Sequence, residues 1–187
     1  APDFDYNPKE GCKPLPVTFT NLSKYAYTYE WDFGDGNTST EEHPQHTYTR
    51  DDSYTVKLKA FGPGGDSTVV KVKIITVHDL PRARFNVAPT MLYLPNSTSF
   101  FTNSSFDAFR SNWSVFDQNN QTIFTDTNTN SSYYFNKSGM YSVQLIVMNQ
   151  FGCADTAFSN NIIMVDDQGA VHVPTAFSPN GDGHNET

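Results

Sequence analysis

An internal repeat constrains this sequence more than any other feature. The segments 4–21 and 85–103 both open with F-x-x-x-P and both close with F-T-N. Trp31 recurs 82 positions later as Trp113, and the Y-x-V of 54–56 recurs 87 positions later. The change of offset requires a loop of different length between these two landmarks. The repeat predicts two copies of one unit, each of about 80 residues, followed by a tail.

Strand periodicity runs through the first copy and is repeated in the second. Apolar and polar residues alternate over 54–60, which predicts a strand with one buried face and one solvated face. The segment 67–77 alternates in the same way, so Val70, Val72 and Ile74 are expected inside and the lysines between them outside. No segment has a sustained helical period, and Gly, Pro, Asn and Asp occur at short intervals. The predicted fold class is all-β.

Two aromatic positions in each copy favour an immunoglobulin-like sandwich. Trp31 and Trp113 are expected to fill the space between the two sheets of their copy. Tyr54 and Tyr141 each begin a late strand, where a tyrosine corner packs the ring and bonds the hydroxyl to nearby backbone. As core aromatics, these four residues need no further role.

The repeat also sets the expected domain organisation. We expect two tandem immunoglobulin-like sandwiches at 1–79 and 82–166, then a linker and a short extended tail at 167–187. The hinge between them reads H-D-L-P-R-A, in which Pro81 fixes φ and stiffens the connection.

Composition argues against several classes of function. The formal net charge of -8 disfavours nucleic acid, because phosphate binding needs clustered Lys and Arg. No apolar run reaches the ~18 residues of a membrane-spanning helix. The first ten residues lack the basic start and apolar stretch of a signal peptide, so we expect that one was removed or that the chain is an internal piece of a longer protein. Charged residues make up 17% and aromatic residues 14%, a balance typical of β-sandwiches outside the cell.

The first copy resembles the PKD domain (polycystic kidney disease domain), an immunoglobulin-like β-sandwich. The resemblance rests on W-D-F-G-D-G at 31–36, H-T-Y at 46–48 and Y-T-V at 54–56. Gly34 and Gly36 are suited to the positive φ or tight backbone that ends the strand, and Asp-Gly is a natural turn pair. The structural signature residues of the two copies are Trp31, Asp32, Gly34, Asp35, Gly36, Tyr54, Trp113 and Tyr141.

The second copy is a degenerate PKD-like unit. N-W-S-V-F-D replaces W-D-F-G-D-G, so the turn glycines are absent. The segment 117–120 can still turn, because Asn and Asp tolerate the left-handed region. The late strand keeps its G-x-Y-x-V-x-L-x-V pattern, so the fold is expected to survive.

The acidic motif of the first copy admits a second interpretation. Asp32, Asp35, His43 and His46 have the right chemistry for a metal or an acid–base site. The resemblance instead assigns the two aspartates to turn architecture, and no nucleophile–base set or carboxylate pair stands out. We favour the turn, and expect no catalytic residues, no metal and no cofactor.

The end of the chain carries the most specific resemblance. V-P-T-A-F-S-P-N-G-D-G-H-N resembles the opening of the gliding-motility-associated C-terminal domain, the type B sorting domain of the type IX secretion system. The matching positions of the sorting motif are Val173, Pro174, Phe177, Pro179, Asn180, Gly181, Asp182, Gly183 and Asn185. An EF-hand reading is weaker, because the 12-residue ligand set is absent.

The sorting resemblance implies a Bacteroidota protein that is exported across the outer membrane and whose sorting domain is cut short in this chain. It implies an outer-membrane partner of the PorP/SprF kind. PKD-like arrays before such a domain are typical of large surface adhesins of the SprB kind, including those that drive gliding.

The two cysteines leave the redox compartment open. PKD-like domains of such adhesins often pair a Cys after the first strand with one in a late G-C corner. Cys12 and Cys153 hold these positions in different copies, and their would-be partners align near Tyr93 and Asp66. A bridge between them would require distant parts of tandem domains to touch. We therefore expect two unpaired thiols, or partners in domains outside this sequence.

Two surface patterns suggest carbohydrate chemistry. D-S-T and D-T-A, centred on Ser67 and Thr156, resemble the O-glycosylation motif of Bacteroidota. A basic stripe on one exposed face is a candidate groove for an acidic polysaccharide, although lysines that protect a sheet edge explain it as well. The stripe consists of Lys57, Lys59, Lys71 and Lys73.

Two functions from different classes follow. The favoured one is a non-enzymatic stalk and interaction region of a secreted or surface-anchored adhesin, with the tail addressing export. The alternative is a non-catalytic accessory region of a secreted enzyme that degrades polysaccharide or protein. Sequence upstream of the chain would discriminate them: further PKD-like repeats favour the adhesin, and a catalytic domain favours the enzyme.

Overall fold

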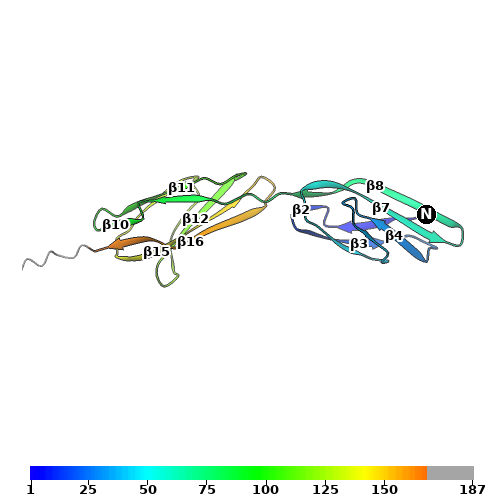
Figure 1. The fold of residues 1–187 in the computed structure, drawn as a ribbon, viewed down its shortest axis with the longest axis horizontal. Helices are drawn as coiled ribbons and strands as arrows, with labels where there is room; N and C mark the ends of the chain where they lie inside the picture. Colours follow the sequence, from blue (N-terminus) through cyan, green and yellow to red (C-terminus); the bar gives the residue numbers. More distant parts are fainter. Residues whose placement is uncertain (168–187) are drawn as a thin grey trace, which may run out of the picture.

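The protein is built from β-strands throughout the part of the chain that the computed structural model describes, residues 1–167 (Figure 1). Their order along the chain is β1 (Phe4–Asn7), β2 (Glu10–Cys12), β3 (Leu15–Asn21), β4 (Thr28–Asp32), β5 (Thr38–Ser39), β6 (Gln45–Tyr48), β7 (Asp52–Gly62), β8 (Gly65–His78), β9 (Phe85–Ala88), β10 (Met91–Tyr93), β11 (Thr98–Asn103), β12 (Arg110–Phe116), β13 (Thr122–Asp126), β14 (Ser131–Tyr134), β15 (Gly139–Met148) and β16 (Ala154–Asp166). The predicted all-β class is confirmed.

The first eight strands form one sandwich. A three-stranded sheet, β1-β3-β6, packs against a five-stranded sheet, β2-β8-β7-β4-β5. Every second residue of β3 from Leu15 to Asn21 is buried, as period-two alternation requires. The core between the sheets is aromatic, with Trp31 and Phe19 at ring-centroid distance 5.6 Å.

The last eight strands repeat that plan. Sheet β14-β11-β9 faces sheet β10-β16-β15-β12-β13, and Trp113 and Phe101 occupy the places of the first tryptophan and phenylalanine. Each sandwich also contains one parallel pair, β2 with β8 and β10 with β16, beside its antiparallel strands. The sequence repeat is therefore a structural repeat of two immunoglobulin-like sandwiches.

The two sandwiches follow one another end to end (Figure 1). The amino terminus lies near the outer end of the first sandwich, β2 and β8 end at the connection, and β16 runs to the outer end of the second. Among the described residues, no helix is long and apolar enough to cross a membrane. The sorting motif, from 173 to 185, lies outside them.

The expected phase of β8 is wrong over part of its length. Val70 and Val72 are 48% and 68% exposed, whereas Ile75 and Val77 are buried. The partners of the buried β7 residues show why: Leu58 pairs with Val69, Val56 with Lys71 and Tyr54 with Ile75, so the odd-numbered residues of β8 face the core. A bulge between these pairs adds two residues to β8, an even number, so the same set faces the core on both sides of it.

Candidate functional site: the disulfide-linked junction

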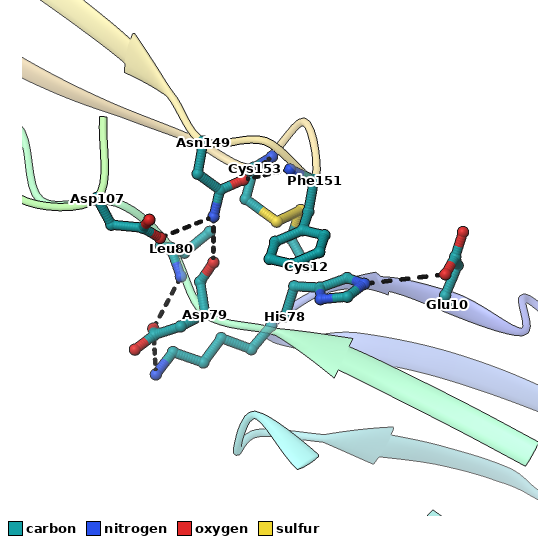
Figure 2. Close-up of a disulfide and its surroundings, with 10 residues drawn as sticks. Glu10, Cys12, His78, Asp79, Leu80, Asp107, Asn149, Phe151 and Cys153 are labelled. Carbon is teal, nitrogen blue, oxygen red and sulfur yellow. Dashed lines mark hydrogen bonds and ion pairs between the residues drawn. A yellow bond between two sulfur atoms is a disulfide. The ribbon is translucent and has the colours of Figure 1, made fainter. Parts of the chain in front are cut away.

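The junction between the sandwiches is covalently closed. Cys12 and Cys153 form a disulfide, with Cα atoms 5.5 Å apart across a sequence separation of 141 (Figure 2). The expectation of two unpaired thiols is therefore wrong. The physical reason is that tandem sandwiches bring two specific loops together at their shared end, even though the remainder of each domain stays apart.

Strand pairing places Cys12 at this end. It is the last residue of β2, which runs parallel to β8, and it pairs there with His78. The backbone N–H of Lys13 donates to the His78 carbonyl at 3.0 Å, so the chain beyond Cys12 stays attached to the strand that leads into the hinge.

A tight turn places Cys153 opposite. The turn joins β15 to β16, and the Asn149 N–H donates to the Cys153 carbonyl at 2.9 Å. Gly152 adopts a φ of 83°, which the turn requires. Cys153 is 1% exposed, so the sulfur on this side is shielded from solvent.

Asn149 joins this turn to the hinge. Its side-chain oxygen accepts hydrogen bonds from the N–H groups of Phe151 and Cys153, at 3.1 and 3.0 Å. Its side-chain nitrogen donates to the Asp79 carbonyl at 3.0 Å and to a carboxylate oxygen of Asp107 at 3.2 Å (Figure 2). The amide is 3% exposed and fully used, so losing it would leave buried partners unpaired.

An aromatic stack packs beside the disulfide. The rings of His78 and Phe151 lie 3.9 Å apart at their centroids and are tilted by 9° (Figure 2). The histidine belongs to the first sandwich and the phenylalanine to the second. Phe151 is 54% exposed, so this contact covers the junction at the surface and belongs to neither core.

Charged and polar groups hold the hinge from both sides. Lys13 forms an ion pair with Asp79 at 2.6 Å, and this hydrogen-bonded contact lowers the pKa of the Asp79 carboxyl. On the other side, the Ala83 N–H donates to Asp155 at 2.8 Å. The hinge is thus attached to the residue that follows β2 in one sandwich and to β16 of the other.

The topology of the two sandwiches explains why these cysteines meet. In the first sandwich, β2 and β8 end at the junction, and Cys12 is the last residue of β2. In the second sandwich, the turn between β15 and β16 lies at the end where the chain arrives from the junction, and Cys153 lies in that turn. The spacing of the cysteines alone could not reveal this, because it carries no information on which ends meet.

The W-D-F-G-D-G motif forms the turn that follows β4. Asp32 accepts a hydrogen bond from the Gly34 N–H at 2.9 Å and pairs with Lys57 at 3.1 Å. These contacts lower the pKa of the Asp32 carboxyl. Gly34 and Gly36 have φ values of 82° and 93°, so the expected positive φ is confirmed at both.

Asp35 and His46 form a close pair, with 2.7 Å between carboxylate oxygen and Nε2. Burial raises the pKa of Asp35, but the hydrogen bonds from His46 and Asn37 outweigh it and lower the pKa overall. The imidazole stacks on Phe33 at 4.3 Å. This arrangement fixes the turn against the core.

The remaining member of the candidate metal or acid–base set lies elsewhere. His43 accepts a hydrogen bond from the Asn21 N–H at 3.1 Å and takes no part in the Asp35 pair. Residues 1–167 contain no group of three or more His, Cys, Asp or Glu side chains that could hold a metal ion.

The aromatic signature residues have matching roles in the two copies. Trp31 and Trp113 are at most 1% exposed, and their indole N–H groups donate to the carbonyls of Glu41 and Asn128. The hydroxyl groups of Tyr54 and Tyr141 each donate to the carbonyl four residues earlier, at 2.8 and 2.9 Å, as a tyrosine corner requires.

The lysines do not form one exposed stripe. Lys57 and Lys59 lie on the outer face of β7, where the second pairs with Asp66 at 2.9 Å. Lys71 is paired opposite the buried Val56, and its ammonium group lies 4.5 Å from the centroid of the Phe4 ring. Lys73 lies in the bulge with a φ of 50°. The prediction that all four share one face is wrong, because Lys71 belongs to the core-facing set of β8 and Lys73 lies in the bulge.

The two candidate glycosylation sites are both exposed. Ser67 is on β8 opposite Ala60, and Thr156 is on β16 opposite Ile146. The aspartate before the second site, Asp155, is already engaged with the hinge.

These features define a class: a pair of immunoglobulin-like β-sandwiches joined by a covalent junction. The family model described as "PKD domain" matches residues 2–77, so the first sandwich is similar to that family.

Curated relatives match over shorter segments. The pre-pro-metalloprotease PrtV of Vibrio cholerae serotype O1 (strain M66-2) is 43% identical over 61 residues, which are 32% of this chain and 7% of that protein. Collagenase ColQ1 of Bacillus cereus (strain Q1) is 61% identical over 31 residues, 17% of this chain and 3% of that protein. The chain thus spans less than a tenth of the length of either relative.

Among solved structures, a structure of the fibronectin(III)-like modules of Clostridium thermocellum CbhA is similar to this chain. The match covers 88% of this chain and 95% of the CbhA chain, at 15% identity and a TM-score of 0.41.

Proposed function

We propose that the chain is a non-catalytic, rigid spacer within a protein that works outside the cytoplasm. The observation that carries this proposal is the covalent junction. A flexible linker lets tandem sandwiches bend, whereas a disulfide, a buried amide and an aromatic stack at one connection resist bending.

An extracellular location is supported independently of the tail. A disulfide persists in an oxidising compartment and is reduced in the cytosol of most organisms. The relatives named above are a pre-pro-metalloprotease and a collagenase, and each matches only over a small part of its length. A short shared segment of this kind suits an accessory domain.

Small-angle X-ray scattering tests the spacer. The oxidised chain should fit one elongated shape, and the Cys12→Ser/Cys153→Ser variant should need an ensemble of bent shapes. Tyr134→Ser, an exposed change on β14 remote from the junction, serves as the control and should scatter like the parent. An oxidised chain that needs as broad an ensemble as the double variant would contradict a rigid spacer.

The parent protein is proposed to be a surface adhesin exported by the type IX secretion system and associated with the outer membrane. The tail resemblance supports this assignment. Removing the residues beyond Asp167 from the intact parent should then abolish its delivery to the cell exterior, measured by fractionation and surface labelling. Unchanged delivery would contradict a sorting role for the tail.

An accessory region of a secreted degradative enzyme is the second candidate. It is favoured by the similarity to the protease and the collagenase. A catalytic domain encoded upstream in the same parent would decide for it.

A further inference from the structure

The disulfide changes how the chain can transmit a pulling force. Between the two cysteines, the covalent route through the backbone is 141 residues long, while the route through sulfur joins two Cα atoms 5.5 Å apart. When both ends of the chain are pulled, the shorter route becomes taut first. The segment 13–152 then carries no tension, and the load passes from residues before Cys12 to residues after Cys153.

In the second sandwich, the loaded route is a single strand. Force enters at Cys153, next to the first residue of β16, and leaves beyond Asp166, the last residue of β16. A strand of 13 residues is already extended at about 3.3 Å per residue, so tension along it gains almost no length. Its hydrogen bonds to β15 and β10 lie across the strand and need not break.

In the first sandwich, the loaded route is also a short extended segment. It comprises β1 and β2, which pair with β3 and β8 and lead from the outer end of the domain to the junction (Figure 1). Phe4 anchors this route in the core at 1% exposure, and Lys71 donates to its carbonyl and covers its ring.

The loaded strand of the second sandwich contains a compliant point. Val143 pairs with Ser159 and Tyr141 with Ile163, so three residues of β16 form a bulge opposite Ser142. The Ser142 hydroxyl holds this bulge by donating to Asn160 and accepting from the Asn161 N–H, at 2.9 and 3.0 Å. Straightening the bulge would release at most about 10 Å of chain.

We propose that residues 4–12, the Cys12–Cys153 bridge and residues 153–166 form one tension-bearing strap that runs the length of both sandwiches and shields their cores from load. The inference rests on the proposed spacer role, since only a protein held at both ends experiences such a load. Without the bridge, tension entering at β9 and leaving at β16 would act across the second core itself.

Single-molecule force spectroscopy tests the strap. The full 187-residue chain is held by enzymatically attached handles at both ends, so that no added thiol competes with the bridge. The oxidised chain should extend without unfolding steps at forces that unfold the reduced chain. The reduced chain should unfold in two steps, and the 140 residues from 13 to 152 should add about 490 Å of contour length at about 3.5 Å per residue.

Two variants separate the strap from the remainder of the junction. Cys12→Ser/Cys153→Ser should behave as the reduced chain does, with or without reductant. Phe151→Ala removes the stack on His78 but keeps the bridge, so its trace should stay free of steps when oxidised.

Three outcomes would overturn the strap. One is an intact bridge, verified by mass spectrometry, together with steps at or below the force that unfolds the reduced chain. Such steps would release about 9 or 14 residues, the lengths of 4–12 and 153–166, because the strap strands would then peel away. Another is two free thiols in the chain purified without reductant. The third is a Phe151→Ala trace with steps while its bridge is intact. If scattering shows a bent oxidised chain but force spectroscopy shows no unfolding steps, the rigid spacer is contradicted and the strap is supported.

Discussion

Gly34 and Gly36 lie in one turn but differ in the space available for a side chain. Their φ values, 82° and 93°, both lie in the left-handed region that disfavours a side chain. A Cβ on Gly34 would collide with the Thr55 carbonyl, whereas a Cβ on Gly36 would meet nothing within 4 Å. The second copy dispenses with both glycines, since Asn120 takes the left-handed conformation, with a φ of 59°.

Replacing each glycine by alanine should therefore give unequal losses. Gly36→Ala carries only the backbone strain, about 1 kcal/mol of the free energy of unfolding of the first sandwich. Gly34→Ala adds a clash with backbone that cannot rotate away, and should cost about 3 kcal/mol or more. Urea unfolding followed by tryptophan fluorescence measures both. Equal losses of unfolding free energy at the two positions would show that the close approach of Gly34 to Thr55 does not affect stability.

At the scale of the strand, the two copies share a bulge that sequence periodicity could not locate. Lys73 in β8 and Asn161 in β16 occupy the same place, with φ values of 50° and 49°. In each case, the backbone N–H donates at 3.0 Å to a hydroxyl on the neighbouring strand, that of Thr55 or Ser142. Asn tolerates this conformation and Lys does not, so the first copy is strained where the second is not.

Exchanging the two residues tests that strain. Lys73→Asn should raise the free energy of unfolding of the first sandwich by about 0.5–1 kcal/mol, and Asn161→Lys should lower that of the second by a similar amount. Thermal unfolding by calorimetry resolves the two changes if each is made alone. A Lys73→Asn protein less stable than its parent would contradict the account. Val72→Asn, an exposed neighbour outside the left-handed region, is the matched control and should not stabilise.

The strands that could be predicted from the sequence are those whose alternation is uninterrupted. The alternation of β7 places Val56 and Leu58 in the core, and the structure buries both completely. In β8, the same reasoning fails at Val70 and Val72. The adjacent apolar pairs at 69–70 and 74–75 fit either phase of the alternation, and the structure places the odd-numbered residues inside. The lysine stripe failed for the same reason, since the assumed phase placed Lys71 on the outer face of that strand.

At the scale of the molecule, the order and the repeat of the sandwiches could be predicted, but their junction could not. Duplicated aromatic landmarks are local and survive in sequence, as Trp31 and Trp113 do. The contact between Cys12 and Cys153 depends on which loops of two domains meet, and it is fixed by the topology of both domains together. Asn149, which ties the turn to the hinge, carries no motif at all.

The bridge also has a consequence for how the protein is made. Cys12 is synthesised 141 residues before Cys153, whose turn forms when β15 and β16 pair. The correct sulfur bond can therefore close only on a molecule in which both halves have matured and docked. A molecule that still reacts with a thiol reagent is therefore one whose two domains have not both folded and docked. A cell that released only the oxidised form would in this way release only molecules with both domains folded.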